Sequence, residues 1–135
     1  MSDVAIEARW VGGLRFEAVG RGGVPMALDG DSADGPSPPE ALLMSLGACM
    51  GVDVVDILTK MRVPLAALTV RVEGDRRADP PRRYTAVRLV YRASGVPDAD
   101  RPKLERAVDL SRDRYCSVWH TLRPDLELAI GIENG

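Results

Sequence analysis

The chain contains two cysteines, Cys49 and Cys116, in two different settings. Cys49 lies within a long apolar run, residues 38–61, whereas Cys116 follows a charged run and precedes Ser117. Two thiols can perform a redox cycle, in which one thiolate attacks an oxidant and the other closes a disulfide. The alternatives are a buried Cys49 that packs as a small hydrophobe and a Cys116 that is an incidental loop thiol.

A redox role for Cys49 requires that its thiol ionise near neutral pH. Helical spacing puts Asp53 one turn after Cys49, where its charge would raise the pKa of the thiol. Cys49 also lies about three turns from the predicted helix start, where the helix dipole has faded. We therefore expect activation by a cation from another segment, with Arg15 as the first candidate and Arg9 and Arg21 behind it.

The single histidine, His120, lies four residues after Cys116. If this segment is helical, the two side chains share a face, which leaves open a metal site with Cys49 or a Cys–His nucleophile pair. The paired ligand spacing typical of metal sites is absent from the sequence, so a packed or surface histidine is the simpler interpretation. We expect no metal and no organic cofactor.

Length and composition restrict the class of protein. The 135 residues fit one domain, so we predict a single domain over residues 1–135. A net charge of −2 gives no electrostatic footprint for nucleic acid. The sequence has no charge-free apolar run of about 18 residues, and its start does not resemble a secretory signal. We expect a cytoplasmic protein, in a compartment where permanent disulfides are rare.

Alternating apolar and polar residues, bounded by Gly, Pro and Asp, predict six strands. These cover residues 4–10, 14–19, 24–28, 68–73, 84–91 and 126–132. The pair Gly12–Gly13 predicts a hairpin turn between the first two strands. A second helix is predicted from Arg101 to about Arg114, with Asp98 or Asp100 as its N-cap. It is amphipathic, and Leu104, Val108 and Ser111 are expected to face inward. The order of strands and helices is typical of an α+β fold.

The long apolar helix has a clear start. Ser37 and Glu40 have the spacing of a capping box, and Pro38 fits the first helical turn. From Glu40 to about Arg62 apolar residues cover nearly the whole circumference, which predicts a helix buried on most sides. A chain of this length has little other protein with which to surround such a helix. We therefore expect a homodimer in which this helix packs near the partner.

The chain resembles the OsmC/Ohr family (osmotically inducible protein C and organic hydroperoxide resistance proteins), most of all an OsmC-like branch with poorly defined substrates. Besides the two cysteines, the segments that carry the resemblance are residues 35–40, 42–49, 50–62, 104–108 and 115–118. The resemblance as a whole extends over nearly the whole chain. The resemblance implies an α+β fold with antiparallel sheets around a long buried helix. It also implies an intertwined homodimer with two sites at the subunit interface.

For function, the resemblance implies thiol-dependent reduction of organic hydroperoxides in oxidative-stress defence, with a dithiol reductant such as a lipoylated protein. Cys49 matches the peroxidatic cysteine and Cys116 the resolving one, and Arg15 lies near the family's activating arginine. The family's arginine pairs with a glutamate ten residues before the peroxidatic cysteine. Here that position is Pro39, and Glu40 lies nine residues before Cys49. This shift rotates the side chain by about 100° on a helix.

Two other functions fit the same residues. One is a non-catalytic dimeric binder of a small apolar ligand, in which both cysteines are incidental. The other is a different thiol enzyme, which cleaves a thioester or reduces a disulfide. A peroxidase requires the two cysteines within disulfide reach. The apolar neighbours Leu46, Met50 and Val118 are expected to favour an organic hydroperoxide.

Overall fold

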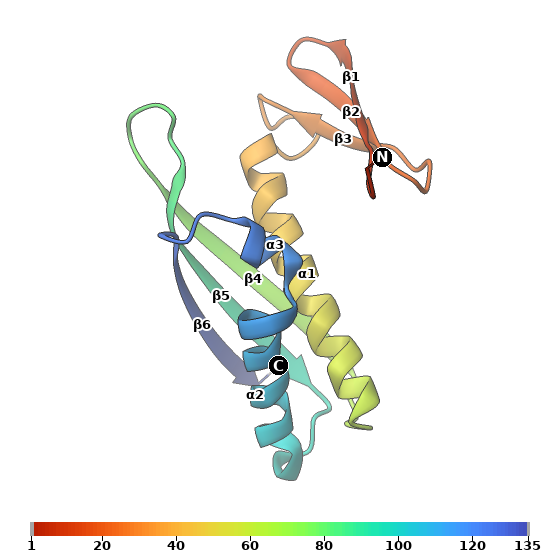
Figure 1. Cartoon of the computed structure of the whole chain (residues 1–135), viewed down its shortest axis with the longest axis vertical. Helices are drawn as coiled ribbons and strands as arrows, with labels where there is room; N and C mark the ends of the chain where they lie inside the picture. The colour runs from red at the N-terminus through yellow and green to blue at the C-terminus, as the bar shows by residue number, and fades with distance from the viewer. Residues whose placement is uncertain (1, 135) are drawn as a thin grey trace. The chain divides into compact units, whose positions relative to one another are not determined.

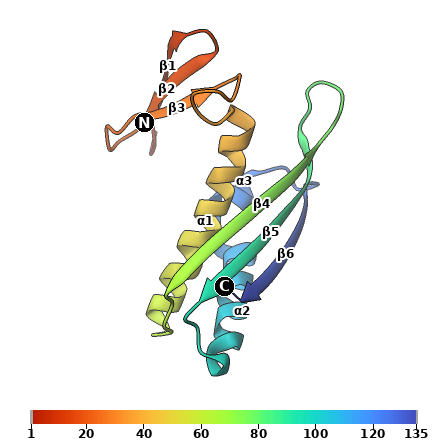
Figure 2. The ribbon, with the colours of Figure 1, turned by 180° about the vertical axis from the view of Figure 1, so that it is seen from behind.

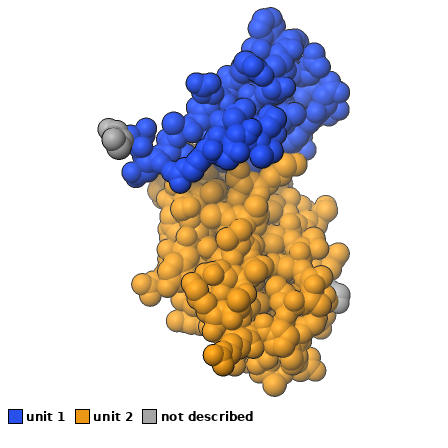
Figure 3. All heavy atoms as spheres, turned by 90° about the vertical axis from the view of Figure 1, so that its right-hand side faces the viewer, with its two compact units in different colours: residues 1–42 blue, residues 43–135 orange. Residues whose placement is uncertain are grey.

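The computed structural model describes residues 2–134 and contains two compact units, Met1–Leu42 and Leu43–Gly135 (Figures 1 and 3). The six predicted strands and both predicted helices are present. In chain order the elements are β1 (Glu7–Gly12), β2 (Arg15–Val19), β3 (Met26–Asp29), α1 (Pro38–Lys60), β4 (Ala67–Arg76), β5 (Tyr84–Ser94), η1 (Asp98–Asp100), α2 (Arg101–Leu110), η2 (Ser111–Tyr115), α3 (Ser117–Thr121) and β6 (Glu127–Asn134).

The first unit is an antiparallel meander in which β2 pairs with both β1 and β3. Gly12 and Gly13 form the turn between β1 and β2 at φ values of 119° and 54°, which glycine adopts without the steric cost of a Cβ. Arg9 lies opposite Glu17 in the ladder, and their side chains form an ion pair of 2.9 Å. The predicted hairpin and its turn are therefore confirmed.

The capping box at the start of α1 is also confirmed. The Glu40 backbone N–H donates to Ser37 Oγ at 3.3 Å, and the Glu40 carboxylate accepts from the Ser37 backbone N–H at 3.2 Å. These reciprocal bonds satisfy two backbone donors at a helix end. The carboxylate also accepts from the Ser32 hydroxyl at 3.1 Å. The carboxylate of Glu40, in the first turn of α1, is thus held by Ser32 and Ser37 of the preceding loop.

The second unit contains a sheet of β4, β5 and β6, and both views show α1 and α2 on the same face of it (Figures 1 and 2). Strands β4 and β5 are antiparallel, as expected, but β6 runs parallel to β5. The expectation of purely antiparallel sheets is therefore wrong for this strand. The connection from β5 through α2 and α3 has the length of a crossover, which returns the chain in the same direction as β5.

The core of the second unit lies between the helices and this sheet. Gly47 brings α1 close to β4, because a Cβ at this position would lie 2.7 Å from Val72 Cγ2. Leu104 and Val108 on α2 and the following Ser111 face inward, as predicted. The largest fully buried side chains of the unit include Tyr91, Leu46, Met50, Leu58, Leu89 and Leu104.

Helix α1 is buried along one face only, which corrects the expectation that it is buried on most sides. Its buried residues follow three- and four-residue steps and are Leu46, Gly47, Met50, Gly51, Val54 and Leu58. Met44 and Val52 remain 55% and 66% exposed, because a single chain covers only one side of the helix. By length and composition α1 could cross a membrane, but a core helix has the same properties and α1 packs in the core.

Candidate functional site

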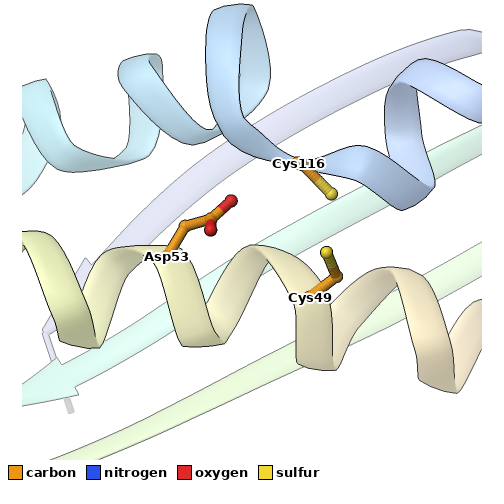
Figure 4. A group of neighbouring side chains, drawn as sticks. All are labelled: Cys49, Asp53 and Cys116. Carbon is orange, nitrogen blue, oxygen red and sulfur yellow. The ribbon is translucent and has the colours of Figure 1, made fainter. Parts of the chain in front are cut away.

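The structure brings Cys49 and Cys116 together, with their side chains pointing toward one another and Asp53 beside them (Figure 4). The two sulfur atoms and a carboxylate oxygen of Asp53 all lie within 4.8 Å of one another. Both cysteines are free thiols. This proximity of two free thiols is what formation of a reversible disulfide requires.

An irregular end of α2 positions Cys116. The predicted helix to Arg114 is present, but its last turn, Ser111–Tyr115, is a π-helix that places the Cys116 backbone N–H 2.9 Å from the Ser111 carbonyl. Such widened turns are frequent at functional sites. Cys116 then serves as the N-cap of α3, and its buried sulfur accepts the Trp119 backbone N–H at 3.3 Å.

Cys49 is half-buried on α1 and faces the start of α3. Partial burial raises the pKa of its thiol, but hydrogen bonding outweighs burial and the net shift is downward. The donors are the Val118 backbone N–H, the Cys116 thiol and the Ser117 hydroxyl, whose oxygen lies 3.9 Å from Cys49 Sγ. Asp53 opposes them, as predicted, because its negative charge disfavours a neighbouring thiolate.

The second thiol has the opposite tendency. Burial raises the pKa of Cys116 to about 11, and the charges of Cys49 and Asp53 act in the same direction. The Trp119 N–H only partly offsets these effects. The site therefore favours one ionised sulfur at Cys49 and one protonated sulfur at Cys116. A two-thiol cycle requires this difference, with an ionised thiol that attacks the oxidant and a protonated thiol that later closes the disulfide.

A buried polar cluster lies behind the two thiols. The Ser111 hydroxyl, fully buried, donates to Asp53 Oδ2 at 2.8 Å. The Tyr91 hydroxyl is also buried, and among residues 2–134 it has no partner with hydrogen-bond geometry, although Ser111 lies beside it. Burial raises the pKa of Tyr91, and the nearby Cys116 and Asp53 add to the shift. Tyr91 is therefore neutral near pH 7.

The predicted residues Arg15 and Glu40 both belong to the unit Met1–Leu42. Arg15 forms an ion pair of 3.5 Å with Asp34, and Glu40 is held by Ser37 and Ser32. Within the described part of the chain, no ion pair joins Arg15 to Glu40. The expectation that activation of Cys49 must come from a cation is incomplete, because neutral donors at the start of α3 already lower the pKa of its thiol.

His120 does not join the thiols. Its Nε2 lies 2.9 Å from the carbonyl oxygen of Arg112, on the exposed side of α3. The metal site of two cysteines and His120 that the sequence left open is therefore not formed. The sulfur and carboxylate atoms of Cys49, Asp53 and Cys116 lie close enough together to hold a cation. Hydrogen bonds from Trp119 and Ser111 already engage two of these residues, so we assign the cluster to thiol chemistry.

Sequence reasoning missed four contributors to the site. Cys116 at a helix start implies free N–H donors in the next turn, but the approach of Ser117 and the Val118 backbone to Cys49 depends on the packing of α3 against α1. Ser111 was predicted to face inward, but its bond to Asp53 depends on the π turn. Tyr91 reads as an ordinary buried strand residue, so its position behind the thiols follows only from the three-dimensional packing.

Comparisons with known proteins identify the family and relatives of this chain. A family model described as OsmC-like protein matches residues 30–130. Protein YhfA of Escherichia coli strain K12 is 40% identical over 111 residues, which is 82% of this chain and 82% of YhfA.

Two solved structures share the fold. A hypothetical protein from Aquifex aeolicus VF5 is 31% identical, with a TM-score of 0.87 over 100% of this chain and 98% of that chain. The organic hydroperoxide resistance protein OhrB of Bacillus subtilis is 16% identical, with a TM-score of 0.64 over 98% of both chains. The match to the family model over most of the sequence shows that this chain belongs to the OsmC family.

Proposed function

We propose that the protein is a thiol-dependent peroxidase that reduces organic hydroperoxides and acts in oxidative-stress defence in the cytoplasm. The observation that carries the proposal is the pair of free thiols within 4.8 Å of each other, one with a lowered pKa and one with a raised pKa. A binder with incidental cysteines does not require this arrangement.

In the first step the Cys49 thiolate attacks the distal oxygen of the hydroperoxide. The O–O bond breaks, the alkoxide leaves and takes a proton, and Cys49 becomes a sulfenic acid. Hydrogen bonds from Ser117 and the Val118 backbone hold the thiolate before attack. We propose that Arg15 adds a cation that favours the same ionised form, as the family resemblance implies.

In the second step the Cys116 sulfur attacks the sulfenic sulfur of Cys49, and water leaves as the disulfide forms. An external dithiol, which we propose to be a lipoyl group, then reduces the disulfide by thiol–disulfide exchange. The dithiol loses two electrons and two protons, and both cysteines return to the thiol form.

The surroundings of Cys49 support an organic substrate, although through other residues than expected. Leu46 and Met50 are fully buried in the core, so they cannot contact a substrate beside Cys49. Val52, three residues after Cys49 on α1, is exposed, and Val118 on α3 is half-buried. These apolar side chains favour contact with the organic part of a hydroperoxide.

We also propose a homodimer. The outer face of α1 exposes Met44, Val52 and Val55, and the first unit exposes Trp10 and other large apolar side chains. Exposed apolar surface of this extent is typical of an interaction site. Light scattering of the purified protein across a dilution series tests this proposal, and a monomer at every concentration would contradict it.

The test of the activity is consumption of cumene hydroperoxide by the pure protein with dihydrolipoamide, in the presence of a chelator. We expect turnover that Cys49→Ser abolishes. We expect Cys116→Ser to stop at a Cys49 sulfenic acid or at mixed disulfides, with dithiol-driven turnover lost. No turnover, and no disulfide after peroxide treatment, would reject the peroxidase and favour the binding protein.

A further inference from the structure

Asp53 is a half-buried carboxylate that the proposed cycle does not use. It lies on α1, one turn after Cys49, and one of its carboxylate oxygens lies within 4.8 Å of both sulfur atoms. The hydroxyl of Ser111 donates to Asp53 Oδ2 at 2.8 Å and so restrains the orientation of the carboxylate. A carboxylate beside two thiols opposes their ionisation, so its presence has a cost for the first step of the cycle.

We propose that Asp53 is the base that removes the proton of Cys116 when the disulfide closes. This inference rests on the proposed two-thiol cycle and assigns a further catalytic residue to its second step. The proton of Cys116 passes to the Asp53 carboxylate as the S–S bond forms. The hydroxide that leaves the Cys49 sulfenic acid then takes that proton and becomes water, so Asp53 returns to its ionised form.

Three observations support this role. Cys116 is fully buried, so bulk water cannot take its proton directly. Burial also raises the pKa of Cys116 to about 11, so few molecules would have its thiolate at neutral pH without a base. Among residues 2–134, the other titratable groups beside Cys116 are Cys49, which is the electrophile in this step, and Tyr91, which holds its own proton because burial raises its pKa.

If Asp53 is this base, removing its charge should slow disulfide closure by Cys116 but should not slow attack by Cys49. The variant Asp53→Asn keeps an oxygen that accepts the Ser111 hydrogen bond but cannot take a proton. Because the negative charge is gone, the pKa of Cys49 falls further, and attack by Cys49 is not slowed. Disulfide closure by Cys116 should become slower by roughly tenfold to a hundredfold at neutral pH. A general base contributes roughly 10²–10⁴-fold, and the lower pKa of Cys116 without the Asp53 charge offsets part of that loss.

The experiment uses the full-length reduced protein and the aromatic disulfide reagent DTNB, followed by stopped-flow absorbance. Cys49 displaces the first coloured thiolate, and Cys116 displaces the second from the mixed disulfide. The leaving thiolate needs no proton, so the second phase reports on deprotonation of Cys116. For Asp53→Asn we expect an unslowed first phase and a slowed second phase whose rate rises with pH, whereas the wild-type second phase is nearly independent of pH.

Control variants distinguish the loss of a base at position 53 from general effects of charge on the helix and of altered packing. Asp56→Asn removes an exposed charge of the same helix that pairs with Lys60 at 2.8 Å, and both phases should stay within twofold of wild type. Asp53→Glu keeps a carboxylate and should retain a faster second phase than Asp53→Asn. The proposal is overturned if Asp53→Asn closes the disulfide at the wild-type rate, if it slows both phases equally, or if Asp53→Glu is no faster than Asp53→Asn.

A second oxidant distinguishes this proposal from the proposed function. With cumene hydroperoxide, trapping with dimedone should show a longer-lived Cys49 sulfenic acid in Asp53→Asn than in wild type. If the wild-type protein shows both phases with DTNB but does not react with the hydroperoxide, the peroxidase is rejected and the role of Asp53 stands. If the wild-type protein reacts with the hydroperoxide and Asp53→Asn closes the disulfide normally, only the role of Asp53 is rejected.

Discussion

The two compact units differ in the chemistry that their side chains can perform. Both have exposed ion pairs, such as Arg9 with Glu17 in Met1–Leu42 and Lys60 with Asp56 in Leu43–Gly135, but the two cysteines belong to the second unit. In Leu43–Gly135 the reactive groups are buried or half-buried and are controlled by neutral hydrogen-bond donors and by burial. Exposed pairs contribute little to stability, whereas groups shielded from water shift strongly in pKa. The chemistry of the thiols is therefore set mainly by the second unit.

Two leucines of α1 provide the strongest test of this contrast. Leu58 is 1% exposed in the core of the second unit, and Leu42, at the end of the first unit, is 41% exposed. Leu58→Ala should lower the free energy of unfolding by about 2–5 kcal/mol, because it leaves a cavity. Leu42→Ala should cost less than about 1 kcal/mol. Urea unfolding at matched protein concentration measures both, and equal losses would contradict the assignment of the core.

The raised pKa of Cys116 predicts a pH dependence of stability. Its pKa rises from 9.0 to about 11 on folding, so the folded state holds this proton more tightly than the unfolded state. Stability from this group is present below about pH 9 and is lost as the pH rises toward 11, by roughly 2 kcal/mol. Tyr91 adds to the loss at the upper end, because burial raises its pKa as well.

Urea unfolding at pH 8, 9 and 10 under reducing conditions checks this expectation. Cys116→Ser should remove part of the decline between pH 9 and 10, and Asp56→Asn should leave it unchanged. A decline of the same size in Cys116→Ser and wild type would show that Cys116 is not the group responsible.

A comparison of Ser117→Ala with Arg15→Ala separates the contributions of the two units to the activation of Cys49. Ser117→Ala removes a hydroxyl 3.9 Å from Cys49 Sγ, so the pKa of that thiol should rise. Arg15→Ala removes the proposed cation. Each change should slow peroxide attack at neutral pH by a few-fold to about tenfold, since one pKa unit corresponds to a tenfold change in thiolate.

The rate of thiol alkylation as a function of pH gives the pKa of Cys49 in each variant. Glu40→Gln is the matched control for Arg15→Ala, because glutamine also serves in a capping box. Its rate should stay within twofold of wild type. A loss with Glu40→Gln as large as that with Arg15→Ala would show that Glu40 takes part in activation and not only in capping.

The smallest expected effect concerns the helix start. Ser37→Ala removes the oxygen that accepts the Glu40 backbone N–H, and it should cost about 1 kcal/mol. Urea unfolding measures the loss, and the pKa of Cys49 should not change. A shift in that pKa would show that the helix start influences the thiol, contrary to the contrast between the two units.

Those features of the fold that are determined by residues close together in the sequence could be predicted. The turn at Gly12–Gly13, the Ser37–Glu40 capping box and the inward-facing Leu104 and Val108 depend on near neighbours, and all were predicted. The parallel pairing of β6 and the one-sided burial of α1 depend on long-range packing, which periodicity does not encode. The apolar circumference of α1 indicated burial but could not show how much of it one chain provides.

The candidate site shows the same division. The two cysteines and the effect of Asp53 on Cys49 were predicted from residue types and helical spacing. The neutral donors at Ser117 and Val118 were not, because they depend on where α3 begins relative to α1. The roles of Arg15 and Glu40 stay predictions that rest on the family resemblance.

The central claim is that Cys49 and Cys116 form an asymmetric thiol pair that closes a disulfide within one chain. The most direct test treats the reduced protein with one equivalent of cumene hydroperoxide, blocks free thiols and maps the cysteines by peptide mass spectrometry. We predict joint loss of both thiols and a Cys49–Cys116 peptide from a single chain. Two unmodified thiols, or oxidation of Cys49 that leaves Cys116 free, would contradict the account.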